Sequence, residues 1–377
     1  MYYFDHSATT KPDKVVLETF VKVNEEFFAN PASLHVMGVD SHVLLSRARK
    51  QVSDMLGTEM NKVIFTSGGT ESNHFAIHGL ALKLHARGKH IITSSIEHPS
   101  VLESMKQLEK QGFEVDYLAV DEKGLISVEE VKARLRKDTI IVSIMHINNE
   151  LGSRQPIKRL SEVIHQNSRA LFHVDAVQSF GKYPVSFTEL GADVLTLSGH
   201  KFNGLKGTGI VAWQNHVSFE PIIVGGGQEF GLRSGTVPVA QAVAFAKAMR
   251  LAFEKQPQML EKYKQWNERL RQSMSEYKEV QILSPEDAAA HILTVSVKEI
   301  KGEVLVNALQ ARDIIVSTSS ACSSKQTKIS HVIQAIGVSD SYKKGVIRIS
   351  FGTSNHDQQI DYFIEQFSII INQLKGE

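Results

Sequence analysis

Asp175 and Lys201 are two residues whose types and positions could do chemistry together. Each follows a mostly apolar stretch, 170–174 before Asp175 and 193–197 before the segment Ser198-Gly199-His200-Lys201. Such stretches predict buried strands, and ligands of open α/β sheets bind at the edge where these strands end. A carboxylate that holds a pyridinium nitrogen and an amine that forms a Schiff base are what pyridoxal phosphate (PLP) requires of a protein. A structural ion pair is the alternative interpretation, and other parts of a cofactor site in the sequence distinguish between the two.

A candidate phosphate-binding turn lies earlier in the chain. Gly68, Gly69 and Thr70 follow the strand expected at 62–66 and open a helix. Glycines let the backbone approach an anion, and the free N–H groups at a helix start attract phosphate. A plain turn is the alternative. Neither the Walker pattern nor the dinucleotide glycine spacing is present, which argues against a nucleotide-hydrolysing enzyme and a nicotinamide-dependent dehydrogenase.

Composition excludes several other classes of protein. The chain has 377 residues, 42% of them hydrophobic, and a formal charge of +1, so we expect a large core and no nucleic-acid partner. We expect no membrane association, because no apolar run of about 18 residues and no signal-peptide pattern occurs. The single cysteine excludes an internal disulfide and favours a reducing, cytosolic compartment. The sixteen histidines show no metal-binding spacing, so no metal is expected.

Alternating strand and helix signals predict the fold class. Helices are expected at 12–28, 38–56, 70–87, 98–111, 127–136 and 156–167. Strands are expected at 62–66, 90–94, 114–118, 140–145, 170–175, 194–198 and 209–213. This alternation is typical of an α/β protein with a mainly parallel seven-stranded sheet flanked by helices. The last two strands follow one another without a clear helix, so one of them is expected to be antiparallel.

The pattern changes after about residue 236. A helical region at 237–277, expected to break near Pro257, precedes strand-like segments at 278–283, 291–297, 313–317 and 345–350. We therefore predict a large cofactor-binding domain at 13–256 and a smaller α+β domain formed by 257–377 together with 1–12. Residues 255–258 are expected to be the linker.

Short motifs spread along the chain carry a family resemblance. They include Asp5-His6-Ser7-Ala8-Thr9-Thr10, Ser67-Gly68-Gly69-Thr70-Glu71-Ser72-Asn73, Glu97-His98, Ser198-Gly199-His200-Lys201, Arg233-Ser234-Gly235-Thr236 and Ser319-Ser320-Ala321-Cys322. With these motifs the chain resembles the cysteine desulfurases of the NifS/IscS type, in the class V aminotransferase group of fold type I PLP enzymes. The resemblance runs from residue 5 to about residue 352. It implies PLP as cofactor, L-cysteine as substrate, L-alanine as product and a homodimer.

The resemblance also implies a role for individual residues. Lys201 would form the Schiff base, Asp175 would hold the pyridine nitrogen, and His98 would stack on the ring and move protons. Further cofactor contacts are expected from Gly69, Thr70, Asn149, Gln178, Ser198 and His200, and from Thr236 of the neighbouring subunit. Arg348 would bind the substrate carboxylate, assisted by Asn30 and Asn149.

Cys322 is the only cysteine of the chain, and the resemblance makes it the residue that carries sulfur. Its surroundings, residues 317–328, are polar and rich in small residues, which predicts an exposed loop. Lys325 and Lys328 would favour the reactive thiolate. An inert buried cysteine is the alternative interpretation. On the first interpretation Cys322 takes the substrate sulfur as a persulfide and passes it to an acceptor protein.

The identity of the acceptor stays open, with an iron–sulfur scaffold or a tRNA-thiolating enzyme as the two candidates. The sequence departs from the commonest family pattern at Gly69, where alanine is frequent, and at residues 202–205 after the lysine. A selenocysteine lyase or another class V β-lyase is the nearest alternative activity. A non-catalytic sulfur carrier or scaffold is the alternative of another class, although Lys201, Asp175, His98 and Arg348 are all present.

Overall fold

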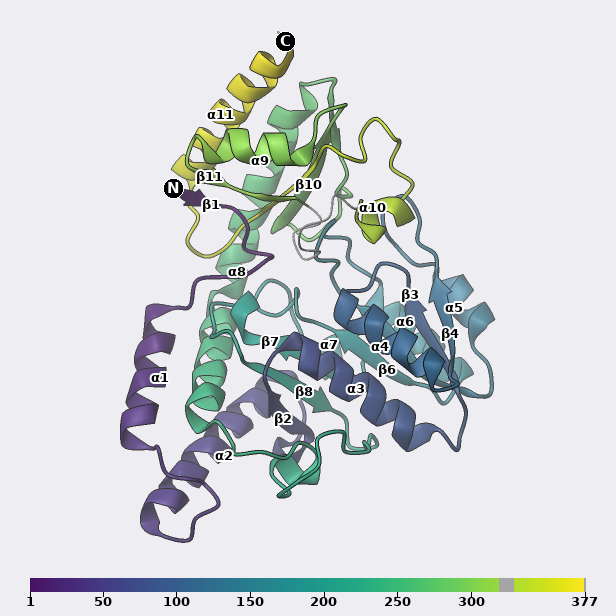
Figure 1. Cartoon of the computed structure of the whole chain (residues 1–377), viewed down its shortest axis with the longest axis vertical. Coiled ribbons are helices and arrows are strands. Elements are labelled where there is room, and N and C mark those ends of the chain that lie inside the picture. The colour runs from purple at the N-terminus through teal and green to yellow at the C-terminus, as the bar shows by residue number, and fades with distance from the viewer. Residues whose placement is uncertain (319–328, 376–377) are drawn as a thin grey trace.

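The computed structural model describes residues 1–318 and 329–375 of the chain, and its larger sheet has seven strands (Figure 1). The strands are β2 (Val63–Thr66), β3 (His90–Ser94), β4 (Glu114–Leu118), β5 (Thr139–Met145), β6 (Leu171–Asp175), β7 (Val194–Ser198) and β8 (Gly209–Trp213). Their order is β2-β8-β7-β6-β5-β3-β4. β8 is antiparallel to both of its neighbours, β2 and β7, and the other pairs of this sheet are parallel. The prediction of a mainly parallel seven-stranded sheet with one late antiparallel strand is therefore confirmed.

Helices cover both faces of this sheet, because successive strand residues point to opposite sides. Ile91 packs into an apolar cluster with residues of α3 and α4, and its neighbour Ile92 packs into a second cluster with residues of α2, α6 and α8. The helices up to the end of the sheet are α1 (Lys14–Glu26), α2 (Val36–Leu56), α3 (Gly69–Leu84), α4 (Pro99–Lys110), α5 (Val128–Arg134), α6 (Ile157–Asn167) and α7 (Phe187–Leu190).

A smaller antiparallel sheet lies in the part of the molecule that holds both termini (Figure 1). Its order is β12-β13-β10-β9, and two further short strands, β1 and β11, pair in parallel. These strands are β1 (Tyr2–Tyr3), β9 (Val280–Ile282), β10 (Ile292–Val297), β11 (Ile314–Ile315), β12 (Ser317–Thr318) and β13 (Val346–Ser350). The expected packing of the N-terminal residues with this region is confirmed, since β1 pairs with β11 and Phe4 is fully buried in its apolar cluster. The single strand expected at 313–317 is divided between β11 and β12, which belong to different sheets.

One long helix, α8 (Val239–Ser275), connects the two sheets. Its N-terminal half contributes Phe245 to a cluster of the large sheet, and its C-terminal half contributes Tyr263 and Trp266 to the cluster of the small sheet. The expected break and linker near Pro257 are wrong, because the helix continues through this residue. Packing of both halves compensates for the one backbone hydrogen bond that proline removes. The proposed domain boundary at residue 257 stays a prediction.

The remaining helices, α9 (Gly302–Gln310), α10 (His331–Ala335) and α11 (Asp357–Lys375), belong to the C-terminal region. Across the described part of the chain, no helix combines the length and the apolar character needed to cross a membrane.

Candidate active site

A cavity of about 210 Å³ lies at the edge of the large sheet where β6 and β7 end. The residues that line it come from the N-terminal segment, the starts of α3 and α4, the ends of β5, β6 and β7, and β13. The sequence-predicted residues that it brings together are Gly69, Thr70, His98, Asn149, Asp175, Gln178, Ser198, His200, Lys201 and Arg348. The parallel pairing of β6 with β7 therefore places the acid and the amine at one edge, as the two apolar stretches predicted.

Lys201 reaches the cavity from a short 3₁₀ turn, Gly199–Lys201, that directly follows β7. Its ammonium nitrogen Nζ donates hydrogen bonds to the carbonyl oxygens of Ser7, at 2.5 Å, and Ala8, at 2.9 Å. These bonds tie the lysine to the N-terminal segment. The partners are neutral backbone oxygens, which an incoming group can replace without leaving a buried charge behind.

Asp175 is buried at the end of β6 and is held by two N–H donors. Its Oδ2 accepts from the Asn73 side-chain amide at 2.7 Å, and its Oδ1 accepts from the Val177 backbone N–H at 2.9 Å. These donors fix the direction of the carboxylate. Sequence reasoning did not single out Asn73, which lies only three residues after the candidate phosphate-binding turn and lines the same cavity.

His98 is the N-cap residue of α4 and is half-buried. Its Nδ1 accepts a hydrogen bond from the backbone N–H of Ser100 at 3.1 Å, and the Ser100 hydroxyl lies 2.8 Å away. Burial lowers the pKa of His98, with the charge of Lys201 acting in the same direction and that of Asp175 opposing it. The imidazole is thus neutral near pH 7, and because Nδ1 is an acceptor, Nε2 carries the proton.

The turn that is expected to bind phosphate lies at the start of α3. The N-cap residue Gly68 has a φ of 148°, and no side chain caps the first turn of the helix. A second open hollow of about 400 Å³ lies over this turn and shares Gly69, Thr70, Ser198 and His200 with the first cavity. Uncapped N–H groups at a helix N-terminus are an anion-binding arrangement.

Arg348 enters the cavity from β13 and is almost fully buried. Its Nη2 lies 2.8 Å from Oδ1 of Asp5, and its Nη1 donates to the backbone oxygen of Asn149 at 2.9 Å. Its Nε is buried without a partner among the described residues. Burial raises the pKa of Asp5, and Arg348 opposes that rise. Sequence reasoning missed this acid, although the motif that contains Asp5 was recognised.

Two predicted residues, Asn30 and Thr236, do not line the cavity. Asn30 is exposed in the turn between α1 and α2, where its Oδ1 accepts from the backbone N–H of Ala32. Thr236 is exposed before α8 and lines neither hollow described above. Cys322 lies outside the described residues.

The residues of the cavity fit the cofactor that the sequence implied. PLP carries a phosphate, an aromatic ring with a basic nitrogen and an aldehyde carbon. The uncapped start of α3 suits the phosphate, the oriented Asp175 carboxylate suits the ring nitrogen, and the Lys201 amine suits the aldehyde. Within the described residues, no cluster of three or more His, Cys, Asp or Glu side chains could hold a metal ion.

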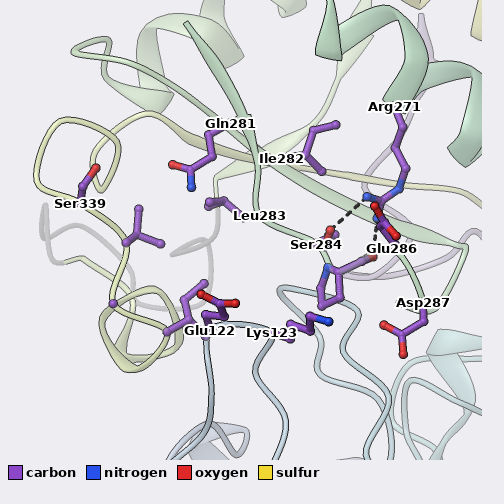
Figure 2. A pocket seen from close by; sticks show the side chains of 14 residues that line it. Glu122, Lys123, Arg271, Gln281, Ile282, Leu283, Ser284, Glu286, Asp287 and Ser339 are labelled. Atoms are coloured by element: carbon purple, nitrogen blue, oxygen red, sulfur yellow. Dashed lines mark hydrogen bonds between the residues drawn. The ribbon is translucent and has the colours of Figure 1, made fainter. Parts of the chain in front are cut away.

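A larger groove of about 790 Å³ lies elsewhere, between β9, the end of α10 and the loop before α5 (Figure 2). The guanidinium of Arg271 lines it but is engaged by the carbonyl oxygens of Ser284 and Pro285, as the dashed lines in Figure 2 show. None of the described site residues lines this groove. The smaller cavity is therefore the candidate for the chemistry.

Comparisons with known proteins identify the family of the chain. The family model "Aminotransferase class-V" matches residues 2–363. The chain is 42% identical to a "NifS/IcsS protein homolog" of Lactobacillus delbrueckii subsp. bulgaricus, covering 98% of this chain and 97% of the relative. It is 40% identical to "Cysteine desulfurase IscS" of Methanosarcina thermophila, covering 99% and 93%.

Solved structures of similar proteins have the same fold. A "NIFS-LIKE PROTEIN" superposes with a TM-score of 0.92 at 37% identity, covering 98% of this chain and 99% of the other. The structure described as "SspA in complex with cysteine" superposes with a TM-score of 0.81 at 34% identity, covering 93% and 99%.

Proposed function

The chain belongs to the class V aminotransferase family, and from this membership we propose that it is a PLP-dependent cysteine desulfurase. It would convert L-cysteine to L-alanine and keep the sulfur as a persulfide on Cys322. The observation that carries the proposal is the convergence of Lys201, Asp175, His98 and Arg348 on one cavity. Relatives named cysteine desulfurase, and a similar structure described as a complex with cysteine, support the choice of substrate.

We assign the cofactor contacts from the lining of the cavity. Asp175 would hold the ring nitrogen and Lys201 would bind the aldehyde carbon. Gly69, Thr70, Ser198 and His200, at the turn that opens α3, would hold the phosphate. Gln178 and Asn149 would contact the phenolic oxygen of the ring. Bound PLP supplies an electron sink for the negative charge that develops at the substrate α-carbon.

The protein's own side chains bind the substrate and move its protons. Arg348 is placed to bind the substrate carboxylate, because its unpartnered Nε and its Nη groups form a planar set of donors beside the cavity. Lys201 takes the α-proton. His98, neutral and with its proton on Nε2, exchanges a proton with the reacting groups.

Cys322 completes the reaction by attacking the substrate sulfur as a thiolate. The carbon–sulfur bond breaks, the carbon keeps the electron pair and is protonated, and the new sulfur–sulfur bond leaves a persulfide on Cys322. The described residues that flank its segment support this assignment. Thr318 pairs with the neighbour of Arg348 on β13, and Nε2 of His331 lies 3.0 Å from the backbone oxygen of Glu97, which precedes His98.

We further propose that the protein is a homodimer. Several large apolar side chains of the α1–α2 region are exposed in the single chain, among them Phe28 at 71%, Leu34 at 97% and Val36 at 73%. Exposed apolar patches of this kind are typical of protein–protein interfaces. A second subunit would cover them, and Thr236 would then contact the phosphate site of its neighbour.

The proposed protein works in the cytoplasm and passes its sulfur to an acceptor, either an iron–sulfur scaffold or a tRNA-thiolating enzyme. Two variants distinguish this function from that of a selenocysteine lyase or a non-catalytic carrier.

Cys322→Ser should keep the colour of the bound cofactor but lose persulfide formation from L-cysteine. Lys201→Ala should lose the yellow absorption of the attached cofactor. Normal persulfide yield from Cys322→Ser would refute the assignment of that residue, and an unchanged yellow spectrum of Lys201→Ala would refute the other.

A further inference from the structure

The side chain of Asn73 uses all of its hydrogen-bonding groups inside the candidate site. Its Nδ2 donates to Oδ2 of Asp175 at 2.7 Å and to the hydroxyl of Ser100 at 2.9 Å. Its Oδ1 accepts from the hydroxyl of Thr196 at 2.6 Å. The residue is 1% exposed. An asparagine side chain has two N–H donors and one carbonyl acceptor, so each of these groups is engaged.

The bond from Asn73 to Ser100 continues to His98. A backbone N–H can only donate, so the N–H of Ser100 at 3.1 Å makes Nδ1 of His98 an acceptor. The Ser100 hydroxyl, 2.8 Å from the same nitrogen, must therefore donate to it as well. Ser100 thus receives a hydrogen from Asn73 and gives its own to His98.

Buried partners behind Asn73 fix the orientation of its amide. Thr196, whose hydroxyl donates to Asn73, lies 3.2 Å from Nε2 of His173, and Nδ1 of that histidine lies 2.8 Å from the hydroxyl of Ser143. All three residues are at most 1% exposed. A flipped Asn73 amide would set its oxygen against the Asp175 carboxylate, which can only accept, so the chemistry of this partner assigns the orientation.

We propose that Asn73 is a positioning residue that supports Asp175 and His98 together. It aims the Asp175 carboxylate and, through Ser100, holds His98 as the neutral tautomer with its proton on Nε2. This inference rests on the proposed function, in which both residues act at the cofactor ring. It predicts that one amide couples cofactor binding to the protonation of His98.

The Asn73→Asp and Asn73→Ala variants test the first half of the coupling through the affinity of the cofactor-free protein for PLP, measured by absorbance titration. A donor to a charged group is lost in both, so binding should weaken roughly tenfold or more. The nearly isosteric aspartate should bind PLP no better than alanine, because its carboxylate lacks the donor and faces Asp175. If Asn73 only fills space, Asn73→Asp will bind PLP like the wild type, and the proposal is wrong.

The Ser100→Ala variant tests the second half through the pKa of His98, followed by NMR in the cofactor-free protein. The charged and titratable groups that act on His98 are Asp175, Lys201, His200 and His331, and the variant leaves all four in place. Loss of the hydroxyl donor removes support for the neutral ring, so its pKa should rise by roughly half a unit to one unit. The affinity for PLP should fall less than in Asn73→Ala, because the bond from Asn73 to Asp175 remains, whereas Asn73→Ala should shift both quantities.

Ser104→Ala is the matched control, since Ser104 lies one turn further along α4 and its hydroxyl donates to the backbone oxygen of Ser100 instead of to His98. It should change neither quantity. Ser100→Ala keeps the backbone N–H that the His98 side chain caps, so it tests the coupling even if the Asn73 variants are unstable. An unchanged pKa of His98 in Ser100→Ala would overturn the proposal. A wild-type protein that binds no PLP would instead refute the proposed function, and the His98 titration would still decide the coupling.

Discussion

Lys182 is a buried lysine next to the candidate site, and the cost of burying its amine can be measured. Its side chain is 6% exposed, and its Nζ donates to the backbone oxygen of Lys201. No salt bridge of Lys182 forms within the described residues. Burial, followed by the positive charge of Lys201, lowers the pKa of Lys182 from 10.5 to about 7. A buried amine without a counter-charge is costly to protonate.

The cost follows from the change in pKa. The difference between 10.5 and about 7 is about 3.5 units, which corresponds to about 5 kcal/mol at 1.36 kcal/mol per unit. Between these two pH values the unfolded chain binds the proton and the folded protein does not. The free energy of unfolding therefore rises with pH across this window, and the whole penalty is present at pH 7 and below.

Replacement of Lys182 by methionine removes this penalty. The variant loses one hydrogen bond to the Lys201 carbonyl, worth about 1 kcal/mol. We therefore expect Lys182→Met to be more stable than the wild type by about 4 kcal/mol near pH 7, with the gain shrinking toward zero near pH 10.

Urea unfolding of wild type and variant at both pH values measures the effect. Lys158→Met is the matched control, because Lys158 also donates to a backbone carbonyl, that of Thr188, but is exposed. It should change the free energy of unfolding by less than about 0.5 kcal/mol at either pH. A Lys182→Met variant that is less stable at pH 7, or whose effect does not depend on pH, would refute the reasoning.

Three further perturbations have expected outcomes. Arg49→Met should lower the free energy of unfolding by about 3–5 kcal/mol in urea titrations, because the buried Glu229 carboxylate loses the two 2.7 Å hydrogen bonds from the guanidinium. Adding Glu229→Gln should restore part of the lost stability, and full stability of the single variant would contradict this account. The kcat/KM profile should lose activity from His98 protonation only below pH 6.5, since burial lowers the pKa of this residue; an acid limb centred above that value would argue against it. Gly199→Ala should lower the free energy of unfolding by about 1–3 kcal/mol and reduce the cofactor content after purification, because the new methyl group would collide with the Thr208 hydroxyl. An unchanged midpoint of thermal unfolding would contradict this expectation.

Local patterns in the sequence were sufficient to predict the parts of the site that depend on single elements. The strands before Asp175 and Lys201 are buried apolar runs, and the turn at Gly69 follows a strand and opens a helix. Parallel neighbours end at the same edge, so the positions of these groups followed from the strand order. The large sheet was predictable for the same reason.

Contacts between distant segments could not be predicted in this way. Asp5 and Arg348 are 343 residues apart in sequence, and their pairing depends on the packing of the N-terminal segment against β13. Asn73 was recognised only as the last residue of a motif, because its partners on β6 and β7 are distant in sequence. Pro257 misled the helix prediction, since tertiary packing outweighed the local penalty.

The measurement that tests the central claim most directly is the yield of alanine and protein-bound persulfide from L-cysteine. The purified, PLP-loaded protein is given the substrate without a reductant. We expect equal amounts of alanine and persulfide, one of each per subunit, with the persulfide on Cys322. Alanine without persulfide would contradict sulfur transfer through this residue and indicate a lyase that releases its product directly. Neither product, with PLP bound, would contradict the assignment of L-cysteine as the substrate.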